Sequence, residues 1–233
     1  MISVVIPTFD AESHLTPTLA ALVPAAMDGL VRELVIADGG SGDRTLELAD
    51  DAGAVVVKAE RGRGPQLIAG AERAKSPWLL FLHADTVLEP GWESEASTFM
   101  GAVDRGMRSE AAAAFRFALD DKGLAPRVLE RLVAFRSLAL RLPYGDQGLL
   151  ISRRLYDKVG GFAALSIMED VDFIRRLGRA NIAMLNARVT TSAARYRRDG
   201  YLRRTFRNQT CLALYALGMP PERIAKRYSG SDA

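Results

Sequence analysis

The chain has 233 residues, of which 48% are hydrophobic and 25% charged, and its formal net charge is +3. This length suits one domain with an ample core, and the composition is ordinary for a globular protein. The single cysteine, Cys211, excludes a disulfide framework or a cysteine-based metal site within one chain, which fits a reducing compartment.

The N-terminal residues 2–6 have no basic region before them and run directly into Asp10 and Glu12, so they predict a strand and not a signal peptide. No apolar run approaches the ~20 residues that a helix needs to span a bilayer. We therefore expect a cytoplasmic protein that is at most peripheral to the inner membrane face, with no nucleic-acid partner. Residues 195–227 carry nine bases against Asp199 and Glu222, a balance that suits phosphate, anionic lipid or an acidic partner.

Strands and helices alternate through the first 86 residues with short connections between them. Such a βαβ series implies a mostly parallel sheet with helices on both faces, the Rossmann-like form of the α/β class. The buried strands are expected at 2–6, 34–37, 54–58 and 78–82, with helices at about 15–23, 44–52 and 65–75.

The second half of the chain is less regular, and no linker marks a domain boundary. We therefore expect one domain that ends in a C-terminal helical extension. Helices are predicted at 92–100, 124–142, 153–159, 168–177, 201–217 and 220–228, and strands at 111–119, 149–152, 182–185 and 189–191.

Three of the first four strands end in a carboxylate, namely Asp10, Asp38 and Asp85. In open α/β sheets, ligands bind in the crevice beyond the carboxyl ends of the strands. Carboxylates that face one crevice repel each other unless a cation, ribose hydroxyls or a base edge satisfies them. Each could instead cap the following helix, but three around one crevice favour a nucleotide site.

Four further features could carry chemistry. Asp85 suits Mg²⁺ or Mn²⁺, and His83 could ligate Mn²⁺ or hydrogen-bond a ribose. The guanidinium groups of Arg61 and Arg63 could bind a diphosphate. The loop at 39–42 lacks the spacing of a dinucleotide-binding loop, so its glycines more simply allow a base or sugar to approach the backbone. The pair 169–170 opens a helix, where acids are favoured by the helix dipole but could also include a general base.

Arginines recur in two helical stretches. Those in 124–142 stand among leucines, which indicates either a basic face for a membrane surface or, the reading we favour, core packing with solvated arginines. Those at the C-terminus could close over the same phosphates as Arg61 and Arg63. This second group comprises Arg195, Arg197, Arg198, Arg203, Arg204 and Arg207.

Taken together, these motifs resemble family-2 glycosyltransferases of the GT-A fold over about residues 2–180. The motifs are Val4–Glu12, Ile36–Asp43, Leu80–Thr86, and Gly160-Gly161-Phe162 followed by Met168–Asp172. The His-Ala-Asp-Thr variant and the segment 145–148 further resemble a bacterial subgroup labelled as arsenosugar-biosynthesis or selenodomain-associated glycosyltransferases.

The resemblance implies a role for each part of the chain. Residues 1–86 would bind the nucleotide sugar, 87–194 would form the acceptor and catalytic half, and 195–233 would be a basic helical tail with possible membrane contact. Asp170 would be the base of a direct, inverting displacement, with Glu169 beside it, and Asp85 with His83 would hold Mn²⁺ or Mg²⁺. The remaining substrate contacts would be Pro7, Thr8, Asp10, Glu12, Asp38, Gly39, Arg61, Arg63, Gln66, His83, Ala84, Asp146 and Gln147.

The implied reaction moves a sugar from a nucleotide-diphosphate sugar, most simply a UDP-sugar, to a small-molecule or lipid-linked hydroxyl. Two positions depart from the family pattern: His83 replaces the usual first Asp of the D-x-D element, and Gly42 replaces a common Thr. A sugar-nucleotidyltransferase and a non-catalytic nucleotide-sugar-binding module remain as alternatives. A phosphatase with a strand-end D-x-D-x-T motif is excluded because its nucleophile position would be His83.

Overall fold

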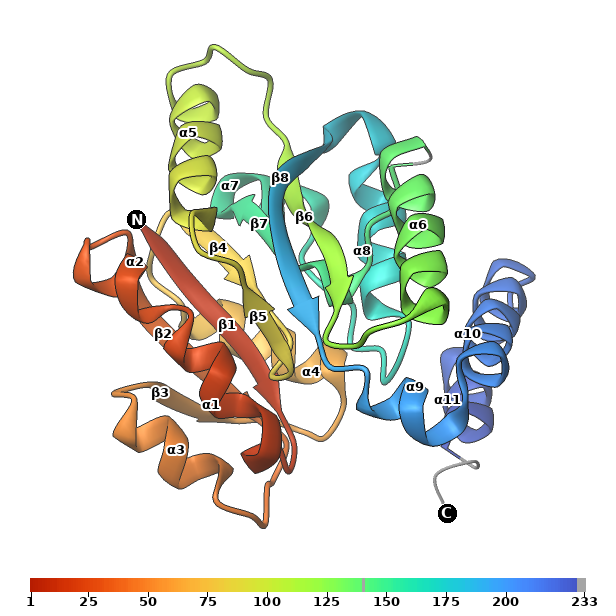
Figure 1. The fold of residues 1–233 in the computed structure, drawn as a ribbon. Helices are drawn as coiled ribbons and strands as arrows, with labels where there is room; N and C mark the ends of the chain where they lie inside the picture. Colours follow the sequence, from red (N-terminus) through yellow and green to blue (C-terminus); the bar gives the residue numbers. More distant parts are fainter. Residues whose placement is uncertain (140, 230–233) are drawn as a thin grey trace.

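The fold of the chain is shown in Figure 1 as a computed structural model, which describes residues 1–139 and 141–229. Its first half is the expected βαβ series. Strands β1 (Ile2–Thr8), β2 (Val31–Asp38), β3 (Val55–Lys58) and β4 (Trp78–Phe81) pair in parallel in the order β3-β2-β1-β4. This order places β1 at the centre and brings the carboxyl ends of β1 and β2 together, with Thr8 opposite Asp38.

The sheet continues without a break into the second half of the chain. Strand β7 (Leu149–Ser152) pairs antiparallel with β4, and the order then runs β6 (Ala112–Leu119), β8 (Ile182–Thr191) and β5 (Thr86–Leu88). The β6–β8 pairing is parallel, whereas the β6–β7 and β5–β8 pairings are antiparallel. The mostly parallel α/β sheet predicted from the sequence is therefore confirmed.

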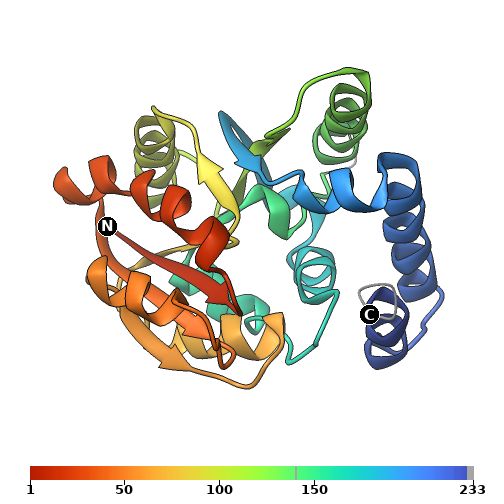
Figure 2. The same ribbon diagram turned by 60° about the horizontal axis from the view of Figure 1, so that its bottom comes forward.

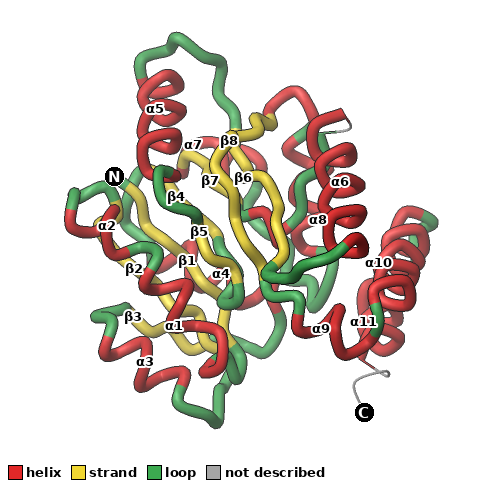
Figure 3. The backbone as a smooth tube through the Cα atoms, viewed as in Figure 1, coloured by secondary structure: helices red, strands yellow, loops and turns green. Residues whose placement is uncertain are grey.

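The sheet is curled so that its β5 edge returns towards β4. Only residues 82–85 separate β4 from β5, yet β5 pairs with β8 at the far edge of the sheet. Within this short connection, Leu82 donates its N–H to the carbonyl of Val5 at 3.1 Å, and the carbonyl of Ala84 accepts from the Thr18 hydroxyl at 2.9 Å. Figure 3 shows β5 beside β8, and β5 also contacts helix α1 (Glu12–Ala20).

Helices cover both faces of the sheet, because successive side chains of its buried strands point to opposite sides. In β1, Val4 and Ile6 pack into one core and Val5 into the other. The first core is covered by α1 (Glu12–Ala20), α2 (Val23–Met27), α3 (Thr45–Asp51) and α5 (Trp92–Asp104), and the second by α4 (Arg63–Arg73), α7 (Arg153–Val159) and α8 (Glu169–Leu177).

The remaining helices surround the carboxyl end of β6. Helix α6 (Leu124–Ala139) packs Leu129 and Val133 against Leu119, and α9 (Ala194–Asp199) leads to α10 (Tyr201–Ala216) and α11 (Pro221–Ser229). Figure 2 shows α10 and α11 side by side at the edge of the molecule. No helix in the described ranges is long and apolar enough to cross a bilayer.

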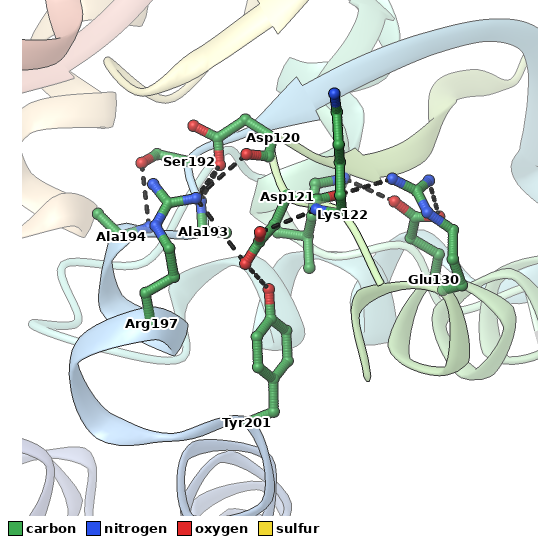
Figure 4. A network of polar contacts seen from close by, with 11 residues as sticks. Asp120, Asp121, Lys122, Glu130, Ser192, Ala193, Ala194, Arg197 and Tyr201 are labelled. Carbon is green, nitrogen blue, oxygen red and sulfur yellow. Dashed lines mark hydrogen bonds and ion pairs between the residues drawn. The ribbon is translucent and has the colours of Figure 1, made fainter. Parts of the chain in front are cut away.

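A polar network fastens α9 and α10 to the loop after β6 (Figure 4). The Tyr201 hydroxyl donates to Asp121 Oδ2 at 2.7 Å, and Arg197 Nη1 lies 3.4 Å from Asp120 Oδ1. From the α6 side, Glu130 accepts the N–H of Leu119 at 2.8 Å. The C-terminal extension is thus joined to the sheet by specific contacts.

Several elements differ from the sequence prediction. The single helix expected at about 15–23 is two helices, α1 and α2, separated by residues 21–22. The strands expected at 182–185 and 189–191 form one strand, β8, because polar Asn186 is satisfied within it: its N–H donates to Glu95 and its side chain accepts from Arg116, both at 2.6 Å. Strand β5 and helix α9 were not predicted. Both are short, and β5 depends on pairing with a strand about a hundred residues away.

Candidate active site

Two loops at the carboxyl ends of β1 and β2 are hydrogen-bonded to each other. Gly42 donates its N–H to Asp10 Oδ1 at 2.8 Å, and Asp10 donates its own N–H to Ser41 Oγ at 2.9 Å. One turn further, the N–H of Glu12 donates to Asp43 Oδ2 at 2.9 Å. Asp10 itself adopts a left-handed backbone with φ of 47°, which Asp tolerates better than most residues. The edge is therefore held in place before any ligand arrives.

Asp38 lies at the centre of this edge, where it is buried. Its carboxylate accepts from the Thr8 hydroxyl at 3.0 Å, from the Ser41 hydroxyl at 2.5 Å, and from the N–H groups of Gly40 and Ser41 at 2.8 and 2.9 Å. Burial alone would raise the pKa of Asp38, but the hydrogen bonds led by those from Ser41 outweigh it and lower that pKa. Asp38 is therefore an ionised residue that organises the loop.

Gln66 and Arg61 are also held by neighbouring groups. Gln66 donates both amide hydrogens to strand-end carbonyls, at 2.6 Å to Thr8 and 2.8 Å to Ala37. It therefore positions the ends of β1 and β2 and packs under Gly39, where an added Cβ would lie 3.2 Å from its Nε2. The Arg61 guanidinium stacks 3.8 Å from the centre of the Phe9 ring, a cation–π contact at the exposed rim.

A cleft of about 320 Å³ opens beside this edge, between the β4–β5 connection, the 3₁₀ turn η1 (Gly145–Gln147), and helices α6, α8, α9 and α10. Five of the predicted site residues line it: Arg63, His83, Asp85, Asp146 and Asp170. The opposite wall is mixed apolar and polar. It includes Phe117, Leu129, Val133, Arg136, Tyr144, Arg195, Tyr196 and Asn208.

The acids in the cleft act on one another. Burial raises the pKa of Asp146; Arg136 opposes the rise, and the negative charges of Asp170 and Asp85 add to it. Its Oδ1 is buried and has no hydrogen-bond partner among the described residues. Such a buried oxygen, facing further carboxylates, would be satisfied by a cation or by a ligand hydroxyl.

His83 lies on the floor of the same cleft and is neutral at neutral pH. Burial and the positive charge of Arg63 lower the pKa of His83 to about 4, although Asp85 and Asp170 oppose this. A neutral imidazole can ligate a metal or accept a hydrogen bond. Its ring approaches the η1 turn so closely that a Cβ added at Gly145 would lie 2.7 Å from His83 Nε2.

Within the described ranges, no three His, Cys, Asp or Glu side chains gather as a metal-binding group. Asp85 and His83 offer at most two protein ligands. This donor set fits a divalent cation such as Mg²⁺ or Mn²⁺ that takes its other ligands from phosphate oxygens and water. The unpartnered Asp146 Oδ1 in the same cleft is an oxygen that a water on such an ion could satisfy.

Asp170 is fixed at the start of α8. Its Oδ2 accepts the N–H of Gly145 at 2.7 Å, which ties α8 to η1 across the cleft. Met168, two residues earlier, has a left-handed backbone with φ of 67°. This conformation is strained for a bulky side chain, and such strain concentrates at functional sites. The hydrogen bond from Gly145 therefore fixes Asp170 at the wall of the cleft, two residues after the strained backbone of Met168.

Glu169 faces inward, where it is 1% exposed, and neither of its carboxylate oxygens has a hydrogen-bond partner among the described residues. Burial, and then the neighbouring charge of Asp170, raise the pKa of Glu169 to about 7. It lies beside a small apolar cavity of about 30 Å³ that His83 and Asp170 also line. The sequence could not reveal this, because the surroundings of Glu169 come from four separate segments.

Most of the predicted site residues therefore fall into three groups. Five line the cleft, a second set forms the adjoining β1–β2 edge with Arg61 at its rim, and Gln66 and Gln147 are buried in structural contacts. Of the others, Glu169 faces the small cavity and Ala84 is held by Thr18. Gln147 donates to the carbonyl of Phe115 at 2.9 Å and accepts from Ser137 at 2.7 Å. Sequence reasoning missed Tyr144, whose ring lies 4.0 Å from the Arg136 guanidinium; its position next to Gly145 was the available signal.

Most of the C-terminal arginines are engaged within the protein. The carboxylate of Asp199 lies 2.8 Å from guanidinium nitrogens of Arg198 and Arg204 and 2.9 Å from one of Arg207. The hydrogen bonds from Arg198 and Arg204 lower the pKa of Asp199, although desolvation opposes this. Arg197 lies beside Asp120. Arg195 and Arg204 line the cleft, whereas Arg197, Arg198 and Arg207 are paired with acids of the protein.

Known proteins resemble the chain in both sequence and fold. A PGL/p-HBAD biosynthesis glycosyltransferase of Mycobacterium tuberculosis is 32% identical over 115 residues, which cover 43% of this chain and 42% of that protein. Glycosyltransferase AglJ of Haloferax volcanii is 37% identical over 91 residues, covering 36% and 30% of the two chains. The chain thus matches less than half the length of these curated relatives.

Two solved structures share the fold. The crystal structure of S. aureus TarS 1-349 in complex with UDP superimposes with a TM-score of 0.63 at 18% identity, over 82% of this chain and 60% of that one. Glucosyl-3-phosphoglycerate synthase of M. tuberculosis, in complex with Mn²⁺ and UDP-glucose, gives a TM-score of 0.57 at 25% identity, over 81% and 69%. These neighbours confirm the GT-A fold expected for the chain.

The model of the family "Glycosyl transferase family 2" matches residues 3–136, which is more than half of the chain. The matched span contains the β1–β2 edge and His83–Asp85, whereas Asp146 and Asp170 follow it. The narrower subgroup expected from residues 83–86 and 145–148 stays a prediction. On the family match and the shared fold, the chain belongs to glycosyl transferase family 2.

Proposed function

We propose that the protein transfers a sugar from a UDP-sugar to a hydroxyl group, with inversion at the anomeric carbon. The observation that carries this proposal is Asp170. Its carboxylate is held by the Gly145 N–H in the wall of the cleft that His83 and Asp85 also line. A carboxylate fixed at that place is what a general base for a hydroxyl acceptor requires.

The donor would lie across the β1–β2 edge and enter the cleft with its diphosphate. Thr8, Asp10, Glu12, Asp38 and Gly39 form that edge. The carboxylate of Asp38 already accepts hydrogen bonds from its own loop, so its main role would be to keep that loop ordered where the nucleobase of the donor binds. A direct hydrogen bond from the nucleobase to Asp38 would replace one of these. The related structures that were crystallised with UDP and with UDP-glucose support the choice of a uridine donor.

Asp85 and His83 would hold the divalent cation, and Arg63 would add a positive charge on the same side. When bound, the cation supplies neutralising charge to the diphosphate leaving group. Ala84 lies between the two ligands and contributes its carbonyl to Thr18, which fixes the connection. We propose Mn²⁺ or Mg²⁺, since a carboxylate and an imidazole suit both ions.

Asp170 would take the proton of the acceptor hydroxyl as its oxygen attacks the anomeric carbon. The new C–O bond forms on the face opposite the diphosphate, whose own bond to that carbon breaks, so the configuration inverts. Glu169 would act as a positioning residue. When Glu169 is protonated, its carboxyl group is neutral and does not repel the carboxylate of Asp170. Its burial keeps the start of α8 in place.

The acceptor would occupy the outer part of the cleft. Its wall combines the apolar side chains Phe117, Leu129 and Val133 with the polar groups Tyr196 and Asn208. Asn208 keeps one buried amide oxygen without a partner among the described residues. This mixture suits a hydroxyl carried on an apolar or lipid-linked body better than a fully polar sugar chain.

The proposal is tested by UDP release from UDP-glucose and UDP-N-acetylglucosamine with Mn²⁺, with and without hydroxyl acceptors. We expect acceptor-dependent release that Asp170→Asn abolishes while donor binding persists. Asp172→Asn is the matched control, because Asp172 opens the same helix but pairs with Arg176 at 2.7 Å. Donor binding without turnover in any pairing, unaltered by Asp170→Asn, would favour the non-catalytic module. Formation of UTP and sugar 1-phosphate from UDP-glucose and added inorganic diphosphate would favour the sugar-nucleotidyltransferase.

A further inference from the structure

Helix α6 exposes a row of large apolar side chains. Leu124, Val128, Leu132, Phe135 and Leu138, here called the α6 stripe, are each between 52% and 86% exposed. Their spacing of four, four, three and three residues places them on one side of the helix over about 21 Å, at about 1.5 Å per residue. Pro126, Leu129, Val133 and Ser137 are the buried residues of the helix, and they alternate with the stripe on the opposite side.

This arrangement corrects the interpretation favoured from the sequence, in which the leucines of 124–142 packed into a core. Only the inner side of α6 does so, against Leu119 and Ala193. A helix that is apolar on two opposite sides is normally covered on both, and a contiguous exposed apolar surface marks an interaction site more often than isolated exposed residues do. The outer side of α6 therefore needs a partner.

The charges on the exposed part of α6 are all positive. Arg127 and Arg131 are its exposed charged residues. The acid of the helix, Glu130, is turned inward to Leu119 and pairs with Arg127 at 2.5 Å. Arg131 falls within the α6 stripe by its position in the helix and has no ion pair among the described residues. The first turns of α10 repeat this composition, with Leu202, Arg203 and Phe206 all exposed.

Apolar side chains interleaved with arginines are what a helix lying in the membrane interface presents, with its apolar residues at the acyl boundary and its cations at lipid phosphates. A second copy of the chain fits less well. In a two-fold dimer the α6 stripe would pack against itself, which would bring Arg131 to a surface that offers arginine and no carboxylate.

We propose that the α6 stripe, with Arg127 and Arg131, docks the protein onto an anionic membrane surface. This inference goes beyond the proposed transferase activity, since docking requires no donor, metal or turnover. It also has a consequence for the site: Leu129, Val133 and Arg136 on the inner side of α6 line the cleft. If the proposed function holds, the acceptor side of the cleft then opens next to the membrane, where a lipid-linked hydroxyl would be found.

The test is flotation of the full chain with vesicles of phosphatidylglycerol and phosphatidylcholine, compared with phosphatidylcholine alone. We expect binding to the anionic vesicles that falls as salt rises. The double variant Leu132→Gln/Phe135→Gln should bind at least about tenfold more weakly, because burying one large apolar side chain is worth about a tenfold change or more. Arg127→Gln/Arg131→Gln should weaken binding to anionic vesicles by about 5-fold to 25-fold, at about fivefold for each charge, because Glu130 already offsets part of the charge of Arg127.

The matched control is Val23→Gln/Met27→Gln on α2, since these two side chains are exposed apolar residues four positions apart in the other half of the molecule. It should bind like the unchanged chain. In Phe135→Trp, the new fluorophore should shift to shorter wavelength on anionic vesicles, whereas Trp78 and Trp92 are already buried.

Three results would overturn the proposal. The first is the absence of vesicle binding by the folded chain. The second is binding that Leu132→Gln/Phe135→Gln leaves unchanged. The third is a stable dimer in solution that this variant converts to a monomer, which would identify the α6 stripe as a contact between protein copies. All variants are checked by circular dichroism, and UDP release is measured separately without vesicles, so that loss of docking and loss of activity are distinguished.

Discussion

Glu169 should make the stability of the protein fall as the pH rises from about 4.5 to about 7. Its carboxyl is 1% exposed and without a partner among the described residues, and burial followed by the charge of Asp170 raises its pKa from 4.5 to about 7. The folded chain therefore holds a proton that the unfolded chain has lost between these two pH values. Unfolding releases that proton, so the free energy of unfolding decreases with pH across this window.

The size of the effect follows from the two pKa values. At about 1.4 kcal/mol for each pH unit, the difference between 4.5 and about 7 corresponds to about 3 kcal/mol above neutrality. Glu169→Gln keeps the shape of the protonated side chain and removes the ionisation. We expect the variant to be more stable than the unchanged chain by about 3 kcal/mol at pH 8, and by less than about 1 kcal/mol at pH 5.

Urea unfolding followed by the fluorescence of the buried Trp78 and Trp92 measures this difference at each pH. Asp172→Asn is the control. It removes a negative charge from the same helical turn, but this charge is paired with Arg176 in the folded chain. It should give no gain at pH 8 and a loss of up to about 1 kcal/mol. A gain from Glu169→Gln that is absent at pH 8, or equal at pH 5 and pH 8, would refute the reasoning.

Further predictions concern the cleft and its supports. Asp170→Asn should lower kcat for UDP release by about 10²–10⁴ with donor affinity retained, and a chelator should remove activity that Mn²⁺ restores. Gly64→Ala should prevent stable folding, since the added Cβ would lie 2.4 Å from the carbonyl oxygen of Ala163. Gly42→Ala is the control: its added Cβ has no atom within 4 Å, so its melting temperature should stay within a few degrees of that of the unchanged chain. Gln66→Ala should cost about 1–3 kcal/mol in urea unfolding, because the two hydrogen bonds to the strand-end carbonyls of Thr8 and Ala37 are lost, although the Thr8 carbonyl keeps the N–H of Gly39.

The first half of the fold could be predicted from the sequence because its signals are local. Each of β1 to β4 is a short apolar run, and in β4 the side chains of Leu79 and Leu80 are buried in different cores. The grouping of His83, Asp85, Asp146 and Asp170 around one cleft could also be anticipated. For the last two residues that expectation came from the resemblance to the family.

The features that escaped prediction depend on contacts distant in sequence. Nothing near Gln66 indicates that its amide binds the ends of two strands, and nothing near Asp199 indicates that it gathers three arginines. The exposure of Phe135 was likewise hidden, because a helix with leucines on two sides has the same sequence pattern whether one side or both are covered.

The short connection at 82–85 also has a consequence for how the protein folds. Strand β5 can pair only after β8 is in place, and the Thr86–Thr191 and Leu88–Val189 contacts close a loop of about a hundred residues. Pairing between such distant segments forms late, because the chain entropy lost in closing the loop must be spent first. We expect the β1–β2 edge to acquire protection from hydrogen exchange early during refolding, and the His83–Asp85 segment to acquire it only with the final closure of the sheet. The centre of the reaction would then be the last part of the domain to become ordered.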